Sequence, residues 1–212
     1  RWWSSAASDV YKRQILIPIK ANALIEVDIT RGNLNPLPLA VSPLSIDEES
    51  RKGFEKILKK ENIGSEISNI VENNLRISGL FNPLDKKAFL QAPDIANLKP
   101  RFEDWNLIKA QALITGKVNY VDDKLRVEFR LWDVLAAKEM MALAFTTVPN
   151  NWRRVGHIIS DKVYERLTGE KGYFDTRIIY VSEEGPKTQR VKKLAIMDQD
   201  GANNKFLTLG NE

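Results

Sequence analysis

The chain has 212 residues, of which 43% are hydrophobic and 28% charged, so it can bury the core of one large domain or two small ones. It has one histidine and no cysteine, which excludes disulfides, thiolate metal sites and a histidine-based zinc site. Residues 1–23 hold four basic residues and one acidic residue, and thus +3 of the formal net charge of +4, so the rest of the chain lacks the basic stripe expected of a nucleic-acid-binding protein.

The first 23 residues have the composition of a leader. Residues 1–14 show no hydrophobic periodicity, and we expect them to be non-native or a disordered extension. Residues 15–23 join a short apolar run to Ala21-Asn22-Ala23, the small-residue pattern of a secretory cleavage site. This favours the remnant of a signal peptide, with Leu24 as the mature amino terminus; the alternative is a buried strand followed by a loop.

Residues 24–35 form a segment of their own. Apolar and polar side chains alternate over residues 24–30, which predicts a strand. The turn-like residues 31–36 separate it from the rest of the chain, so it is a strand without an obvious sheet.

The next elements are less regular. Residues 38–45 predict a core strand in which Pro43 indicates an edge position or a bulge. The charge-dense residues 47–61, with few apolar anchors, predict a surface helical turn or an insertion.

A clear amphipathic helix is predicted over residues 64–78, with Ser65 as its cap and Gly79 as its end. Its apolar stripe consists of Ile67, Ile70, Val71 and Leu75. A short extended piece at 80–85 and a short helix within 99–110 come next.

Residues 110–148 predict a three-stranded antiparallel meander, around which the rest of the chain is organised. Its middle strand alternates strictly between apolar and charged residues, and Asp122-Asp123 and Leu135-Ala136-Ala137 supply the turns. The apolar positions of that strand are Leu125, Val127, Phe129 and Leu131.

A second strong helix is predicted after Pro149, ending at Thr168-Gly169. Its apolar face consists of Val155, Ile158, Ile159, Val163 and Leu167. Two such helices against a half-apolar sheet predict an α/β fold over residues 36–170, a two-layer sandwich of a mixed sheet with two main helices.

The last part of the chain, residues 171–212, changes character. Strands are predicted at 175–182, 191–198 and 205–209, with an Asp-Gly turn signal between the last two. Three strands are marginal alone, so we expect the first module of something larger.

Catalytic motifs are missing. His157 could act as a general base with Asp161 one turn along the helix, but a structural His–Asp pair is favoured. The sequence holds no nucleophile elbow and no glycine-rich phosphate loop. The acidic pairs at 122–123 and 183–184 are expected in turns, and Trp105, Trp132 and Trp152 are expected to be core anchors. We predict no enzyme and no cofactor.

Residues 151–181 resemble the helix–linker–strand junction of the TolB family, the periplasmic component of the Tol-Pal envelope system. The matching residues are Trp152-Arg153, His157, Ser160-Asp161, Leu167-Thr168-Gly169-Glu170, Gly172, Phe174, Thr176-Arg177-Ile178 and Tyr180. Residues 78–85, 113–118 and 131–133 support the match. The segment around residues 50–61 is longer than in typical members, and the family continues into a six-bladed β-propeller, of which residues 171–212 are the incomplete first blade.

The resemblance implies a non-enzymatic, periplasmic protein, monomeric and peripheral to the membrane, that supports outer-membrane integrity and cell division. Its expected partners are the lipoprotein Pal, bound mainly by the propeller, and the carboxy-terminal domain of TolA. The switchable segment 24–35 is expected to bind TolA by strand addition. The residues implied are Leu24, Ile25, Glu26, Val27, Asp28, Ile29, Thr30, Arg31 and Gly32.

Two alternatives stay open from the residues alone. One is a nucleic-acid-binding α/β module of the anticodon-binding-domain type, which has the same general architecture but needs a basic groove. The other is a small hydrolase that uses His157.

Overall fold

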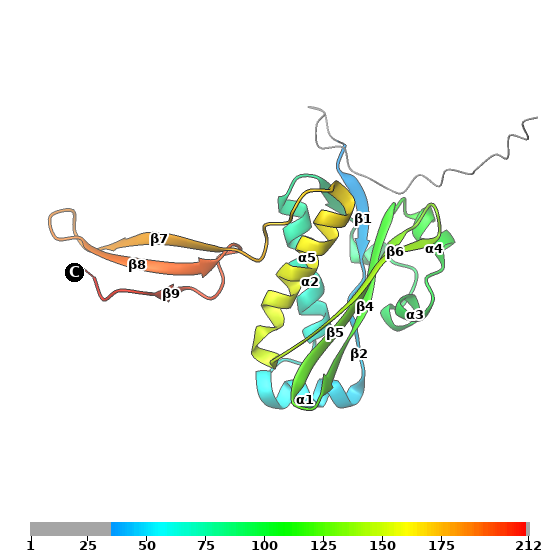
Figure 1. Cartoon of the computed structure of the whole chain (residues 1–212), viewed down its shortest axis with the longest axis horizontal. Coiled ribbons are helices and arrows are strands. Elements are labelled where there is room, and N and C mark those ends of the chain that lie inside the picture. The colour runs from blue at the N-terminus through cyan, green and yellow to red at the C-terminus, as the bar shows by residue number, and fades with distance from the viewer. Residues whose placement is uncertain (1–34, 211–212) are drawn as a thin grey trace, which may run out of the picture.

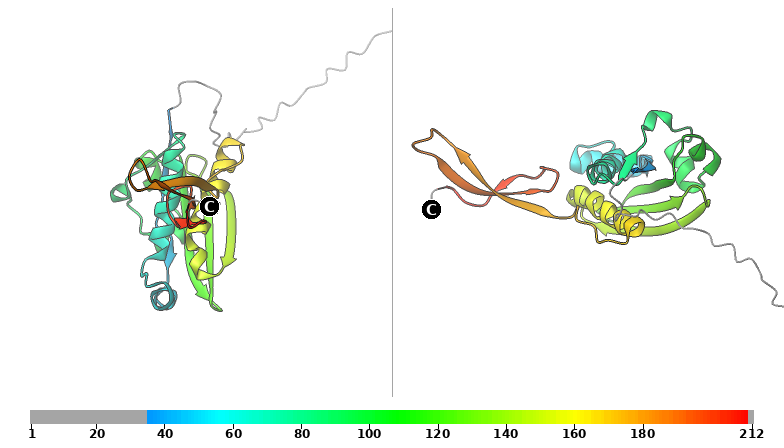
Figure 2. Two further views of the ribbon diagram at one scale, coloured as in Figure 1. Left: turned by 90° about the vertical axis from the view of Figure 1, so that its left-hand side faces the viewer. Right: turned by 90° about the horizontal axis from the view of Figure 1, so that it is seen from above.

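The structure is a computed structural model that describes residues 35–210 (Figure 1). The leader, the signal-peptide remnant and the predicted TolA-binding residues 24–32 lie outside the described residues. The described part consists of an α/β body and a separate small sheet joined to it after helix α5 (Figures 1 and 2).

The main sheet of the described residues has six strands, in the order β3-β1-β4-β5-β6 with β2 also paired to β4. Strand β1 is parallel to both neighbours, whereas β4, β5 and β6 form an antiparallel meander, so the predicted mixed sheet is confirmed. The strands are β1 (Leu37–Val41), β2 (Ser45–Ile46), β3 (Phe81–Pro83), β4 (Ala112–Val121), β5 (Lys124–Asp133) and β6 (Lys138–Thr147).

The meander confirms the alternation seen in the sequence. Leu125, Val127 and Leu131 of β5 are fully buried, and the charged residues between them face outward. Asp122 and Asp123 form the first turn with φ of 50° and 58°, a left-handed conformation that Asp tolerates better than most residues.

The predicted strand at 38–45 is in fact two strands. Strand β1 lies between β3 and β4, so the edge alternative is wrong. The bulge alternative fits, because four steps from Val41 to Ser45 lie opposite three steps from Ile114 to Lys117. The pairing to β4 breaks around Pro43, which has no N–H to donate. Beside it, the Leu44 N–H donates at 2.9 Å to the Ser68 hydroxyl of α2 instead of to a strand.

The helices are α1 (Glu48–Leu58), α2 (Ile63–Ile77), α3 (Pro93–Leu98), α4 (Phe102–Leu107) and α5 (Trp152–Thr168), with 3-10 turns at Lys86–Ala88 and Pro149–Asn151. The charge-dense segment 47–61 contains a full helix rather than a single turn. Asp47 caps α1 by accepting from the Ser50 N–H at 2.7 Å, and Phe54 anchors it in the core. The predicted cap of α2 is wrong, because Asn62 precedes the helix and Ser65 lies in its first turn.

Helices α2 and α5 lie side by side on one face of the sheet and form the main core with it (Figure 1). They approach closely at Gly156, where an added Cβ would lie 2.9 Å from Ile70 Cγ2. Helix α5 ends at Gly169, whose φ of 76° suits glycine. The two predicted amphipathic helices are therefore confirmed.

The opposite face of the sheet is partly covered too. Helices α3 and α4 lie against it, and Trp105 packs with Ala40 and Leu113 in a second, smaller core (Figure 1). Gln91 fixes this layer, because its Oε1 accepts from Trp105 Nε1 at 3.0 Å and its Nε2 donates to the Lys99 carbonyl at 3.0 Å. The body is thus a two-layer sandwich with a partial third layer that the sequence did not predict.

The small sheet contains β7 (Arg177–Glu184), β8 (Val191–Asp198) and β9 (Lys205–Phe206), all antiparallel. It extends away from the body (Figure 2). Glu183 and Glu184 belong to β7, not to a turn as expected. Among residues 35–210, no helix has the length and apolar character needed to cross a membrane.

Candidate functional site

The clearest polar constellation in the described residues lies where the loop after β8 meets helices α2 and α5. We call it the junction site and define it by Asn74, Arg153, His157, Gln199 and Asp200. It joins residues that are up to 125 positions apart in the chain. The sequence singled out Arg153 and His157 among the residues of the family resemblance, and Asp200 as part of the Asp-Gly turn signal.

Asn74 of α2 is the hub of the junction site and is fully buried. Its side-chain Nδ2 donates to Ser160 Oγ at 2.9 Å and lies 3.0 Å from His157 Nδ1. Its Oδ1 accepts from Gln199 Nε2 at 3.1 Å. One amide therefore connects both helices to the small sheet.

These contacts fix the tautomer of His157. Ser160 Oγ donates to the Gly156 carbonyl at 2.9 Å, so it must accept from Asn74, which places the Asn74 NH₂ group beside the imidazole. His157 Nδ1 is therefore the acceptor, and the ring proton lies on Nε2. Because Nδ1 already accepts a hydrogen bond from Asn74, it is not available to take a proton from a substrate, and His157 is not positioned to act as a general base.

Asp200 faces the other edge of the imidazole. Its Oδ2 lies 3.7 Å from His157 Nε2 and forms an ion pair with Arg153 Nη2. His157 is only 3% exposed, and burial lowers its pKa below the ordinary value; the Asp200 and Asp198 carboxylates oppose that shift and Arg153 adds to it. The histidine is therefore held neutral between an amide and an ion pair.

The predicted pairing of His157 with Asp161 is wrong. Asp161 instead binds the linker between α5 and β7. Its two carboxylate oxygens accept from the N–H groups of Phe174 at 2.6 Å and Asp175 at 3.1 Å. Although the two side chains are one helical turn apart, Asp161 is used to hold the linker against α5.

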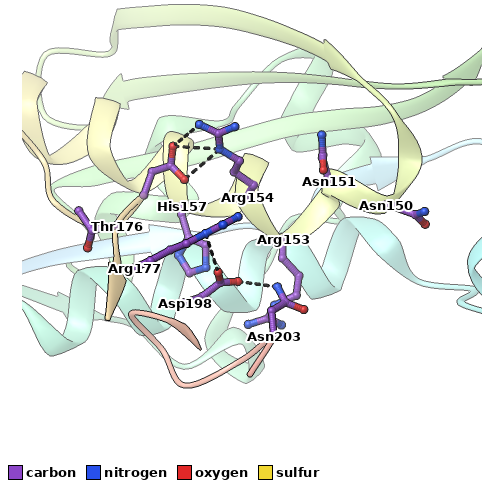
Figure 3. Close-up of a pocket in the computed structure, with 10 residues that line it drawn as sticks. Asn150, Asn151, Arg153, Arg154, His157, Thr176, Arg177, Asp198 and Asn203 are labelled. Carbon is purple, nitrogen blue, oxygen red and sulfur yellow. Dashed lines mark hydrogen bonds and ion pairs between the residues drawn. The ribbon is translucent and has the colours of Figure 1, made fainter. Parts of the chain in front are cut away.

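A polar cavity of about 400 Å³ opens beside the junction site (Figure 3). Arg154 forms a two-pronged pair with Asp175 on one wall, with distances of 3.0 and 3.1 Å, and Arg177 lies 3.7 Å from Asp198 on another. Its lining residues are Asn150, Asn151, Arg153, Arg154, His157, Asp175, Thr176, Arg177, Asp198 and Asn203.

His157, Asp198 and Asp200 place possible metal-ligand atoms within 4.8 Å of one another. The donor set does not fit a metal ion, because Nε2 carries the proton and Asp200 already neutralises Arg153. The arrangement instead fastens the small sheet to the body.

Sequence reasoning did not place Asn74, Gln199 or Asp200 in a site. One signal was present, since Asn74 lies three residues after Val71, on the apolar stripe of a predicted helix, and a polar residue there needs a buried partner. The partner itself could not be read from the sequence. Trp105 and Trp152 are buried as expected, while Trp132 is partly buried and donates to Thr115 Oγ1 at 2.9 Å.

Comparisons with known proteins agree on one family. The sequence model of the TolB amino-terminal domain matches residues 25–140. The chain is 85% identical over 198 residues to the Tol-Pal system protein TolB of Pelagibacter ubique (strain HTCC1062), covering 93% of this chain and 44% of that relative. The chain thus spans less than half the length of that relative.

Solved structures show the same fold. The crystal structure of TolB from Acinetobacter baumannii superposes with a TM-score of 0.66 at 24% identity, covering 87% of this chain and 41% of that one. A PelC dodecamer structure from Paraburkholderia phytofirmans is less similar, with a TM-score of 0.39 at 17% identity, covering 66% of this chain and 94% of that one. The chain therefore belongs to the TolB family of the Tol-Pal system, with the TolB amino-terminal domain at residues 25–140.

Proposed function

We propose that the chain is a non-enzymatic protein-interaction component of the Tol-Pal envelope complex, located in the periplasm, where it supports outer-membrane integrity and cell division. The observation that carries this proposal is the 85% identity to a Tol-Pal system protein TolB over 198 residues. The junction site supports it, because its polar groups are used to connect two parts of the protein rather than to activate a nucleophile.

We assign residues 36–170 to the amino-terminal α/β domain and residues 171–212 to the start of the β-propeller. The small antiparallel sheet, separate from the body, supports this division. In the whole protein the propeller is the main contact for the lipoprotein Pal. This chain covers 44% of the matched relative, so Pal binding depends mainly on propeller residues beyond the matched part. In this proposal the chain acts as a monomer.

Residues 24–35 are the switchable segment of this proposal. Ile25, Val27 and Ile29 alternate with polar residues, a pattern suited to adding a strand to an exposed sheet edge. The free segment binds the carboxy-terminal domain of TolA through Leu24–Gly32, and the docked segment accompanies Pal binding. An equilibrium between these two states is the switch.

Isothermal titration of a peptide of residues 24–32 into the TolA carboxy-terminal domain tests this proposal. The unmodified peptide is expected to bind. Val27→Pro is expected to abolish binding because proline removes a ladder hydrogen bond, whereas Glu26→Gln serves as the control. Absence of heat with the unmodified peptide, or equal binding of the proline variant, would show that strand addition is not the mechanism. The leader ahead of residue 24 is expected to weaken binding.

A further inference from the structure

Strand β6 is a long free edge of the main sheet. It lies at the end of the strand order and pairs with β5 alone among the described residues. The register shifts opposite Leu131 and Trp132, which leaves Met140 unpaired as a bulge, and its carbonyl accepts a long 3.4 Å contact from Arg166. Beyond the bulge, residues 141–147 run as one regular edge.

The part of the edge beyond the bulge, residues 141–147, lacks the usual protection. Natural edge strands carry charges, prolines or bulges that prevent pairing with other chains. Residues 141–147 contain no charge, proline or glycine, and the charged Lys138 and Glu139 precede the bulge. An edge of this kind is competent to accept another strand through its backbone N–H and C=O groups.

The core-facing side of β6 is apolar and only partly covered. Met141, Leu143 and Phe145 pair with the buried residues of β5, yet Leu143 is 37% exposed and the other two are half-buried. Apolar side chains on an added strand would extend this stripe and remove it from water.

The outer side of β6 is hollow and bordered by charges. Ala142 and Ala144 pair with Arg130 and Glu128, and the short alanine side chains leave a depression of about 220 Å³ that Arg126 also lines. An added strand finds room there for longer polar side chains.

Cations are in excess around this depression. Glu128 forms ion pairs with Arg126 (Nε to Oε1, 2.9 Å) and with Lys117 (Nζ to Oε2, 3.5 Å). Arg130 Nε lies 3.4 Å from Glu139 Oε2. The lining of the depression itself holds two cations, Arg126 and Arg130, and one carboxylate, Glu128. Burial acts to raise the pKa of Glu128, but hydrogen bonds and ion pairs with Arg126 and Lys117 lower it below the ordinary value.

We propose that the β6 edge is a docking site for an extended segment of a partner protein, apolar on one side and acidic on the other. Its apolar side chains cover Leu143 and its neighbours, and its carboxylates lie over Ala142 and Ala144 near Arg126 and Arg130. We take the occupant to be a separate partner, because the cations that line the depression call for acidic side chains on the added strand. Residues 24–30, which also alternate apolar and acidic side chains, are the competing occupant that the experiment distinguishes. This surface is distinct from the segment proposed to bind TolA.

The probe is a fluorescein-labelled peptide, Thr-Ile-Glu-Ile-Glu-Ile-Thr, titrated against the 212-residue chain by fluorescence anisotropy. A matched peptide with lysine in place of glutamate is expected to bind about tenfold more weakly. Hydrogen exchange is expected to slow at the alternate amides of residues 141–147 that face away from β5 when the acidic peptide is bound. Binding without protection there would overturn the proposal.

Ala142→Glu places a carboxylate beside Arg130 and is expected to weaken the acidic peptide about tenfold while keeping the fold. Ala136→Glu adds the same charge in the exposed turn before β6 and is expected to leave affinity unchanged. Arg130→Gln removes the positive charge without adding a negative one. If Ala142→Glu does not fold, the affinity of Arg130→Gln for the acidic peptide tests the charge complementarity. Unchanged affinity in Arg130→Gln and Ala142→Glu would refute the charge complementarity.

Two results identify a different occupant. If the edge-facing amides of residues 141–147 are protected before peptide is added, and lose protection when Ile25, Val27 and Ile29 are all changed to Asn, the chain's own segment occupies the edge. If their protection rises with protein concentration, a second copy does. Either result overturns docking of a separate partner.

Discussion

Asn74 of α2 donates from Nδ2 toward Nδ1 of His157 on α5, 3.0 Å away, and the two side chains are 0% and 3% exposed. This contact joins residues 83 positions apart and fixes the histidine tautomer. Asn74 also accepts a hydrogen bond from Gln199 in the loop after β8, so it connects the small sheet to the buried interface between α2 and α5.

Asn74→Ala is expected to destabilise the chain by about 2 kcal/mol, because it leaves the buried His157 Nδ1 without a donor and removes the hydrogen bond that Ser160 Oγ accepts. Asn73→Ala is the matched control on the same helix, since Asn73 is exposed and its change is expected to stay within about 0.5 kcal/mol. Urea denaturation followed by circular dichroism measures both. Equal effects of the two variants would contradict the hub role of Asn74.

His157 is expected to make stability depend on pH. Burial holds its folded pKa below the ordinary value of 6.5, so the unfolded chain takes up the proton first as pH falls. The stabilising contribution is therefore complete above the ordinary pKa and is lost as pH falls through the folded pKa.

Since His157 is the only histidine, His157→Gln isolates this effect. Urea midpoints between about pH 7.5 and about pH 5 are expected to fall more steeply in the unmodified chain than in the variant, because the carboxylates titrate in both. Parallel profiles would exclude a lowered pKa.

Gly156→Ala is expected to destabilise the chain by about 1 to 2 kcal/mol through overpacking, although alanine is the better helix former by about 1 kcal/mol. The added Cβ would lie 2.9 Å from Ile70 Cγ2. Ile70→Ala removes that atom, so the double variant is expected to be more stable than the sum of the single effects predicts. A double-mutant cycle from thermal melts measures the coupling, and additive effects would rule out the clash.

Asp161→Asn is expected to loosen the linker after α5. An amide offers one acceptor oxygen, so either Phe174 or Asp175 loses its partner, at a cost of about 1 to 2 kcal/mol. Hydrogen exchange at those two amides is expected to speed up. Glu165→Gln, on the exposed side of the same helix, is the control and is expected to leave both amides unchanged.

Local patterns predicted the elements whose buried side follows from periodicity. The alternation of β5 and the apolar stripes of α2 and α5 were readable, because pleat and helical turn fix which side chains share a face. Asp122-Asp123 and Gly169 marked turns, because their backbone conformation restricts residue choice. The match to the TolB family was also visible in residues 151–181.

Tertiary structure alone decided what covers each face and which polar groups meet. The interior place of β1, the third layer around Trp105 and the partners of Asn74 depend on contacts between residues far apart in the chain. His157 and Asp161 have the spacing of a pair, yet each binds a group from another element. Spacing along a helix sets which residues can meet, whereas the packing of α2, α5 and the small sheet determines which of them do.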